Sequence, residues 1–265
     1  ILRASLAVAL VASGYGILGA AIGNLIVAMI ICVISIIIWH FTVRTHLIFP
    51  SWAELMRRSK VIQRSKHLSS SILVAVDKNI GALYTILPVL LAGIYLSSSE
   101  VTYFKLAFGF IMLALSLLGP ISTLLNSEFS RMRIDDPKKV ARNFLKVSLY
   151  AVGISTALTL SAIVLAPMVF KTLYGASFLP SVKYVSGLLL YGALFGIGVG
   201  LGPMWRVINR VKTSIIINTV VLSIGIPAGI YLIKHFGVWG GIFMVTAWFT
   251  TTHLVSFFYL LTHLD

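Results

Sequence analysis

Acidic residues are scarce in this sequence, which has only 7 Asp and Glu against 21 Lys and Arg among 265 residues. The few acids fall mostly in loops, so no paired-carboxylate active site is predicted. A single cysteine, Cys32, excludes a disulfide framework. The six histidines are scattered, and none forms a metal-ligand pair. We therefore expect no enzyme activity, no cofactor and no metal site.

Charged residues of both signs are also few. They make up 11% of the chain, whereas 58% is hydrophobic and the mean hydropathy is +1.00. A soluble domain of this size would need more polar surface. Apolar stretches recur that could cross about 30 Å of hydrocarbon, which takes roughly 20 helical residues. The expected fold class is all-α, a polytopic transmembrane helical bundle.

Charge clusters and Gly/Pro turns divide the chain into about eight predicted spans. They lie near residues 1–13, 17–41, 71–96, 101–126, 144–170, 183–205, 213–234 and 239–262. The chain starts at Ile1 and its first span is short, so we expect a fragment that lacks an N-terminal part.

Basic residues concentrate in the loops 42–70 and 127–146 and the turn 206–212, which hold 15 of the 21 Lys and Arg residues. Lys and Arg residues of membrane proteins are enriched in loops on the cytoplasmic side. We therefore predict that the protein lies in the cell inner membrane, with these loops and both chain ends in the cytoplasm. The net charge of +14 is explained by contact of these basic residues with the anionic headgroups of membrane lipids. Nucleic acid is not expected as a partner, because no binding fold accompanies the charge.

Two Gly-rich turns match each other, GYGILGAAIG at 14–23 and HFGVWGGIFM at 235–244. In this register Gly16 aligns with Gly237. Each turn would end a helix pair at the outer face, as in two parallel six-helix repeats, although a chance match is the alternative. The predicted parts are the last helix pair of a first lobe (1–41), a basic inter-lobe loop (42–70) and a six-helix second lobe (71–265).

Asp77 and Lys78 interrupt the span 71–96 near its start. A helical wheel places one stripe of small or hydrogen-bonding residues toward a bundle interior or wet cavity: Asp77, Gly81, Tyr84, Thr85 and Pro88. A second stripe suits lipid: Ile80, Leu83, Leu87 and Leu91. Alternatively the span starts at Asn79 and leaves Asp77 and Lys78 among the headgroups, which avoids a cost of about 3 kcal/mol for a charge at the bilayer centre.

Arg3 and Lys105 are further basic candidates. If the turn lies at 14–16, Arg3 lies about 17 Å from it, near mid-bilayer. Its guanidinium would then face an aqueous cavity and suit phosphate oxygens. A turn nearer 19–23 would return Arg3 to the cytoplasmic interface. Lys105 lies just below the outer face, where snorkelling is the alternative to a ligand role.

Three stretches carry a family resemblance: VDKNIGALYTILPVLLAGIYLSSSEVTYFKLA (76–107), LLGPISTLLNSEFSRMRIDDPKKVARNFLK (117–146) and NRVKTSIIINTVVLSIGIPAGIYLIKHFGVWGGIFM (209–244). They resemble the seventh-to-eighth helix hairpin, the inner end that follows it, and the penultimate helix with its Gly turn. The family is the polysaccharide flippases of the multidrug/oligosaccharidyl-lipid/polysaccharide exporter superfamily. The chain would be the C-terminal two-thirds of such a protein.

This resemblance implies a two-lobed bundle that moves a lipid-linked oligosaccharide across the membrane by alternating access. A cationic cavity would hold the phosphates and sugar of an undecaprenyl-diphosphate-linked unit while the lipid tail stays in the bilayer. Arg3 and Lys78 would contact the phosphates, and Asp77 would pair with a cavity base or respond to a coupling ion, H+ or Na+. Tyr84 and Lys105 complete the candidate substrate-binding set.

Two other functions compete with this one. A drug/cation antiporter on the same scaffold would need a deep acid, for which only Asp77 is available. A membrane glycan polymerase or ligase would need catalytic acids or bases and usually a large outer loop, whereas the predicted outer loops are short.

Overall fold

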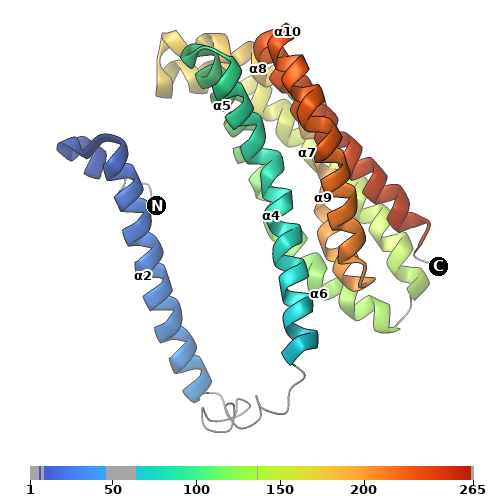
Figure 1. Cartoon of the computed structure of the whole chain (residues 1–265). Coiled ribbons are helices and arrows are strands. Elements are labelled where there is room, and N and C mark those ends of the chain that lie inside the picture. The colour runs from blue at the N-terminus through green and yellow to red at the C-terminus, as the bar shows by residue number, and fades with distance from the viewer. Residues whose placement is uncertain (1–5, 7–8, 46–63, 136, 264–265) are drawn as a thin grey trace. The chain divides into compact units, whose positions relative to one another are not determined.

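The computed structural model describes residues 6, 9–45, 64–135 and 137–263. These residues form helices, and no strand occurs among them (Figure 1). The expected all-α polytopic bundle is therefore confirmed. The chain divides into two compact units, Ile1–Leu68 and Ser69–Asp265, which are described separately. Arg3 and most of the 42–70 loop lie outside the described residues.

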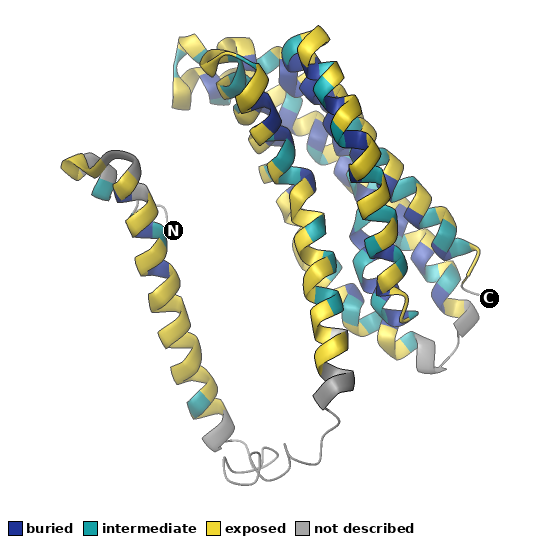
Figure 2. Ribbon diagram, viewed as in Figure 1, coloured by how far each residue is buried: buried dark blue, intermediate teal, exposed yellow. Residues whose placement is uncertain are grey.

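The first unit contains a short π-helix, η1 (Val11–Tyr15), and α2 (Gly16–Thr45). Gly14, with φ of 91°, breaks the helical path before α2. A Cβ at Gly19 would lie 2.8 Å from the Leu10 carbonyl oxygen, so the chain doubles back tightly here. The turn thus lies at 14–16 rather than at 19–23. The mid-bilayer position predicted for Arg3 depends on a turn at 14–16. The side chains of α2 are mostly exposed (Figure 2).

The second unit is a bundle of longer helices. Its elements are α4 (Arg64–Tyr95), α5 (Ser98–Leu115), η2 (Ser116–Leu118), α6 (Gly119–Asp135), α7 (Pro137–Val169), η3 (Phe170–Tyr174), η4 (Ala176–Ser181), α8 (Val182–Gly187), α9 (Leu189–Val207) and α10 (Val211–Leu261). In the described part of the chain, five helices are long and apolar enough to cross a membrane, or six if the pair bent by 55° at Leu188 is one span.

The 51-residue α10 is a hairpin of two spans. As one straight helix it would be about 77 Å long, more than twice the hydrocarbon thickness of about 30 Å. Gly237, with φ of 58° and ψ of −132°, reverses the chain in a conformation that L side chains rarely adopt. The Trp248 ring occupies the space beside Gly225, and Gly240 abuts the Leu232 backbone. The predicted spans 213–234 and 239–262 are these two antiparallel halves (Figure 1).

The two Gly-rich turns share a close backbone contact but differ in which glycine has a positive φ. Gly19 and Gly240, which are aligned in the sequence match, each abut the backbone of the preceding helix. The left-handed residue, however, is Gly14 in the first turn and not Gly16, the residue aligned with Gly237. The turns are therefore alike in close packing, and the two-lobe repeat stays a prediction.

The Gly-rich segment of α9 packs closely against α7. Three glycines one helical turn apart, Gly192, Gly196 and Gly200, face Thr159, the Ala151 backbone and the Phe144 ring respectively. The Ser155 hydroxyl donates to the Ala193 carbonyl at 2.8 Å and accepts from the Gly196 N–H at 3.2 Å. Small residues are the usual means of close helix association in membranes. The glycines of this segment therefore let α9 approach α7 closely.

The lipid-facing stripe predicted for α4 is only partly right. Leu83 is exposed, but Leu91 is buried and Ile80 and Leu87 pack partly against the core. The residues that do face outward are Ile72, Val76, Leu83, Ile86, Leu90 and Ile94 (Figure 2). The reason is that α4 contacts the bundle through Tyr84 and Leu91, two turns apart, so its buried face is rotated from the predicted one.

Candidate functional site

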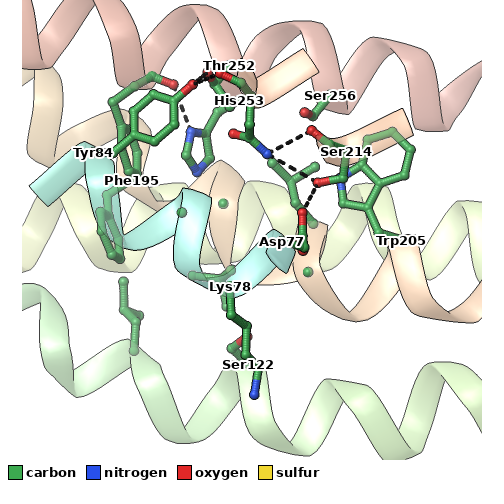
Figure 3. A pocket seen from close by; sticks show the side chains of 18 of the residues that line it. Asp77, Lys78, Tyr84, Ser122, Phe195, Trp205, Ser214, Thr252, His253 and Ser256 are labelled. Atoms are coloured by element: carbon green, nitrogen blue, oxygen red, sulfur yellow. Dashed lines mark hydrogen bonds between the residues drawn. The ribbon is translucent and has the colours of Figure 1, made fainter. Parts of the chain in front are cut away.

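A cavity of about 400 Å³ lies among α4, the α5–η2–α6 segment, α9 and both halves of α10 (Figure 3). Three of the predicted site residues line it together, Asp77, Lys78 and Tyr84. Lys105 is not in its lining and is exposed on α5. Arg3 lies outside the described residues. The structure therefore brings together the part of the predicted set that α4 carries.

Asp77 is anchored to α10 by a hydrogen-bonded chain. The Ser214 hydroxyl donates to Asp77 Oδ1 at 2.7 Å. Asn218 Nδ2 in turn donates to the Ser214 hydroxyl at 3.2 Å and to the Ser214 carbonyl at 2.9 Å. Because α4 begins at Arg64, Asp77 lies well inside a helix whose membrane-length segment starts at Ser71. Asp77 thus lines the cavity, and its depth in the membrane stays a prediction.

Tyr84 extends the same network toward the second half of α10. Its hydroxyl donates to the Asn218 carbonyl at 3.1 Å and lies 2.6 Å from Thr252 Oγ1, which can donate to it in return. The ring meets Trp248 edge-on, with centroids 6.4 Å apart. Tyr84 thus ties α4 to both halves of the α10 hairpin at once.

We expect Tyr84→Phe to lower the free energy of unfolding by about 0.6 kcal/mol, the typical value of a side-chain hydrogen bond between membrane helices. Thermal unfolding of the purified protein in detergent measures this. Tyr150→Phe is the matched control, because Tyr150 is 71% exposed on α7. Thr252→Val should lose a similar amount, and the double variant less than the sum. Full additivity would contradict the shared hydrogen bond.

Lys78 lines the cavity without a partner from the described residues. Neither a hydrogen bond nor an ion pair joins it to the described part of the chain, and its side chain points away from Asp77 (Figure 3). The reason is that neighbouring residues of a helix point about 100° apart and so do not face each other. The cavity therefore offers one anchored carboxylate and one ammonium group that is available to a ligand.

His253 adds an acceptor to the lining. Its Nδ1 lies 2.7 Å from the Phe249 carbonyl oxygen, and the ring stacks on Phe249 with centroids 3.7 Å apart. A carbonyl only accepts, so Nδ1 carries the proton. In the neutral ring Nε2 is then an unprotonated acceptor, and it lies next to Gly198.

Sequence reasoning missed most of the α10 contribution. It did not identify Ser214, Thr252 or Ser256 as cavity residues. The side chain of Asn218 bonds within α10, to Ser214, and only its backbone carbonyl accepts a hydrogen bond from another helix, from Tyr84. Ser214 and Asn218 are four residues apart, as are Thr252 and Ser256. Each pair therefore forms a polar stripe on one helix face, a signal that helical spacing alone contains.

Comparison with known protein families gives a match over most of the chain. A family model described as "Polysaccharide biosynthesis protein" matches residues 1–183. The matched segment contains Asp77, Lys78 and Tyr84, whereas α9 and α10 lie beyond it. No curated protein and no solved structure gave a significant match.

Proposed function

The chain belongs to the polysaccharide biosynthesis protein family, and from this membership we propose that it carries an undecaprenyl-diphosphate-linked oligosaccharide unit across the cytoplasmic membrane. A role in polysaccharide biosynthesis follows from the family, and membrane residence from its long apolar helices. The observation that supports transport is the cavity lined by Asp77 and Lys78 within these helices. Ionisable residues inside a membrane bundle typically mark a substrate or ion pathway.

The chemistry of the lining suits a glycosylated lipid phosphate. Hydroxyl and amide groups of Ser214, Asn218 and Thr252 can exchange hydrogen bonds with sugar hydroxyls. The Lys78 ammonium can pair with a phosphate oxygen by a charge-assisted hydrogen bond. The assignment of Arg3 to the same phosphates stays a prediction, as does a role for Lys105.

The cavity lies toward the basic end of the bundle. Trp205 is near the end of α9 and Ser214 near the start of α10. Three cations lie between these two residues: Arg206 at the end of α9, Arg210 in the connection and Lys212 at the start of α10. The Arg206 guanidinium donates to Asn126 Oδ1 at 2.8 Å, so this cation packs against α6. With Lys and Arg kept inside, the cavity would load from the cytoplasmic leaflet and release outward by alternating access.

A drug/cation antiporter is the second candidate, because Asp77 gives the cavity a carboxylate that could trade a cationic drug for H+ or Na+. Loss of the protein would then raise drug sensitivity and leave surface glycan intact. The transporter of lipid-linked glycan predicts the opposite pattern.

Depletion of the protein in its own cells tests the proposal. We expect lipid-linked repeat units to accumulate on the cytoplasmic leaflet and surface glycan to fall, because the polar head cannot cross hydrocarbon unaided. Leaflet-specific labelling of the units measures this, with re-expression of the wild-type chain as the control. Normal arrival of the units at the outer leaflet in depleted cells would refute the function.

A further inference from the structure

An apolar groove of about 510 Å³ runs along the α10 hairpin, apart from the polar cavity. Both halves of α10 contribute to it, with Ile216, Ile224 and Ala228 from the first half and Trp248 and Val255 from the second. Thr251 is the one hydroxyl-bearing residue in its lining. Ile216 and Ile224 are exposed, so the groove opens on the lipid-facing surface of the described bundle.

The groove runs along the helix axis. From Ile216 to Leu232 its lining extends about 24 Å at helical rise, which is most of a hydrocarbon layer about 30 Å thick. The lining combines the small side chains of Ala228 and Ala247 with branched Ile and Val side chains. The methyl branches of an isoprenoid chain can pack against the small residues and make contacts that a straight acyl chain lacks.

The side chains of Trp248 and Tyr84 lie between the groove and the polar cavity. Trp248 lines the groove, and its ring contacts Tyr84, whose hydroxyl bonds Thr252 in the cavity. Adjacent residues of α10 also face the two spaces, as Ile217 lines the groove and Asn218 the cavity. A molecule with a polar head and an apolar tail could therefore occupy both.

Cations lie at one end of the groove. Lys212 is one helical turn before Ile216, is exposed, and makes no hydrogen bond or ion pair within the described part of the chain. Tyr259, one turn after Val255, accepts a hydrogen bond from Arg210 Nη1 at 2.6 Å. Positive charge at the mouth of an apolar groove complements a lipid whose head is anionic.

We propose that this groove binds the polyisoprenoid tail of a lipid phosphate at the start of transport, with the phosphate at Lys212 and Arg210 before the head moves to Lys78 in the cavity. The inference rests on the proposed function and deepens it, because it places the tail on α10 and not in the surrounding bilayer. Bulk lipid is as apolar as the groove, so selection depends on close packing of the branched chain and on the phosphate contact.

The test uses undecaprenyl phosphate with a benzophenone on its terminal isoprene, bound to the full chain in phosphatidylethanolamine–phosphatidylglycerol nanodiscs. Photolabelling should map to the α10 hairpin. Ala228→Trp, which fills the groove, should reduce labelling about fivefold through lost packing contacts. Lys212→Gln should reduce it to a similar extent. Val164→Trp is the control, because Val164 is 77% exposed on α7, and it should label as the wild type does.

Several results would overturn the groove site. They are labelling outside α10, labelling unaffected by Ala228→Trp, and competition by dioleoyl phosphatidate as effective as by unlabelled undecaprenyl phosphate. The glycan assay separates this inference from the proposed function. If depletion of the protein blocks glycan export but the groove is not labelled, only the groove site is refuted. If the groove is labelled but glycan export continues without the protein, only the proposed function is refuted.

Discussion

Gly196→Ala is expected to lower the free energy of unfolding by about 3 kcal/mol, the upper range for overpacking a well-packed interior. A Cβ at this position would overlap the Ala151 backbone, which is rigid and cannot rotate away as a side chain would. Separation of α7 and α9 would also stretch the hydrogen bonds that Ser155 makes to Ala193 and to the Gly196 N–H. Thermal unfolding in detergent, followed by circular dichroism, measures the loss.

Gly153→Ala is the matched control for this effect. Gly153 lies on α7, where nothing lies within 4 Å of an added Cβ. Alanine there should stabilise the helix by up to about 1 kcal/mol, because glycine is the poorer helix former. Equal unfolding temperatures for Gly196→Ala and Gly153→Ala would show that α7 and α9 do not pack as closely as described.

Asp77→Ala is expected to reduce glycan export about tenfold or more, since a hydrogen bond to a charged group contributes about 1.5–3 kcal/mol. The change leaves the Ser214 hydroxyl without its acceptor and removes one of the two hydrogen bonds that tie α4 to the first half of α10 at the cavity. Transfer of a fluorescent lipid-linked oligosaccharide between leaflets of proteoliposomes measures the rate, with protein content equalised.

Glu128→Ala is the matched carboxylate control for Asp77→Ala. Glu128 pairs with Arg131 at 3.1 Å, but both side chains are exposed, and such surface pairs contribute about 0–1 kcal/mol. Its export rate should equal that of the wild type. Asp77→Asn keeps an acceptor for Ser214 and removes the charge. Export at the wild-type rate by Asp77→Asn would therefore show that Asp77 acts through its hydrogen bond and not through its charge. Wild-type export by Asp77→Ala would remove Asp77 from the site.

The sequence predicted only the part of the candidate site that lies on a single helix, α4. Asp77 and Tyr84 share a face of α4, so helical spacing placed them together and the structure keeps them together at the cavity. The partners of these residues, Ser214 and Thr252, lie on another element. Which faces of two helices meet depends on their packing angle, and the spacing within one helix does not contain that information.

The sequence by itself determined the fold class, the helical spans from residue 17 onward and the sharp turn at Gly237, whereas most of the predicted span 1–13 lies outside the described residues. Backbone groups in hydrocarbon must bond within their own segment, so long apolar runs become helices regardless of their neighbours. Tertiary structure decided which apolar side chains face lipid and which face protein, as Leu91 shows by its burial. Lipid tails and a bundle interior are equally apolar, so hydrophobicity does not separate the two environments and only helix packing can.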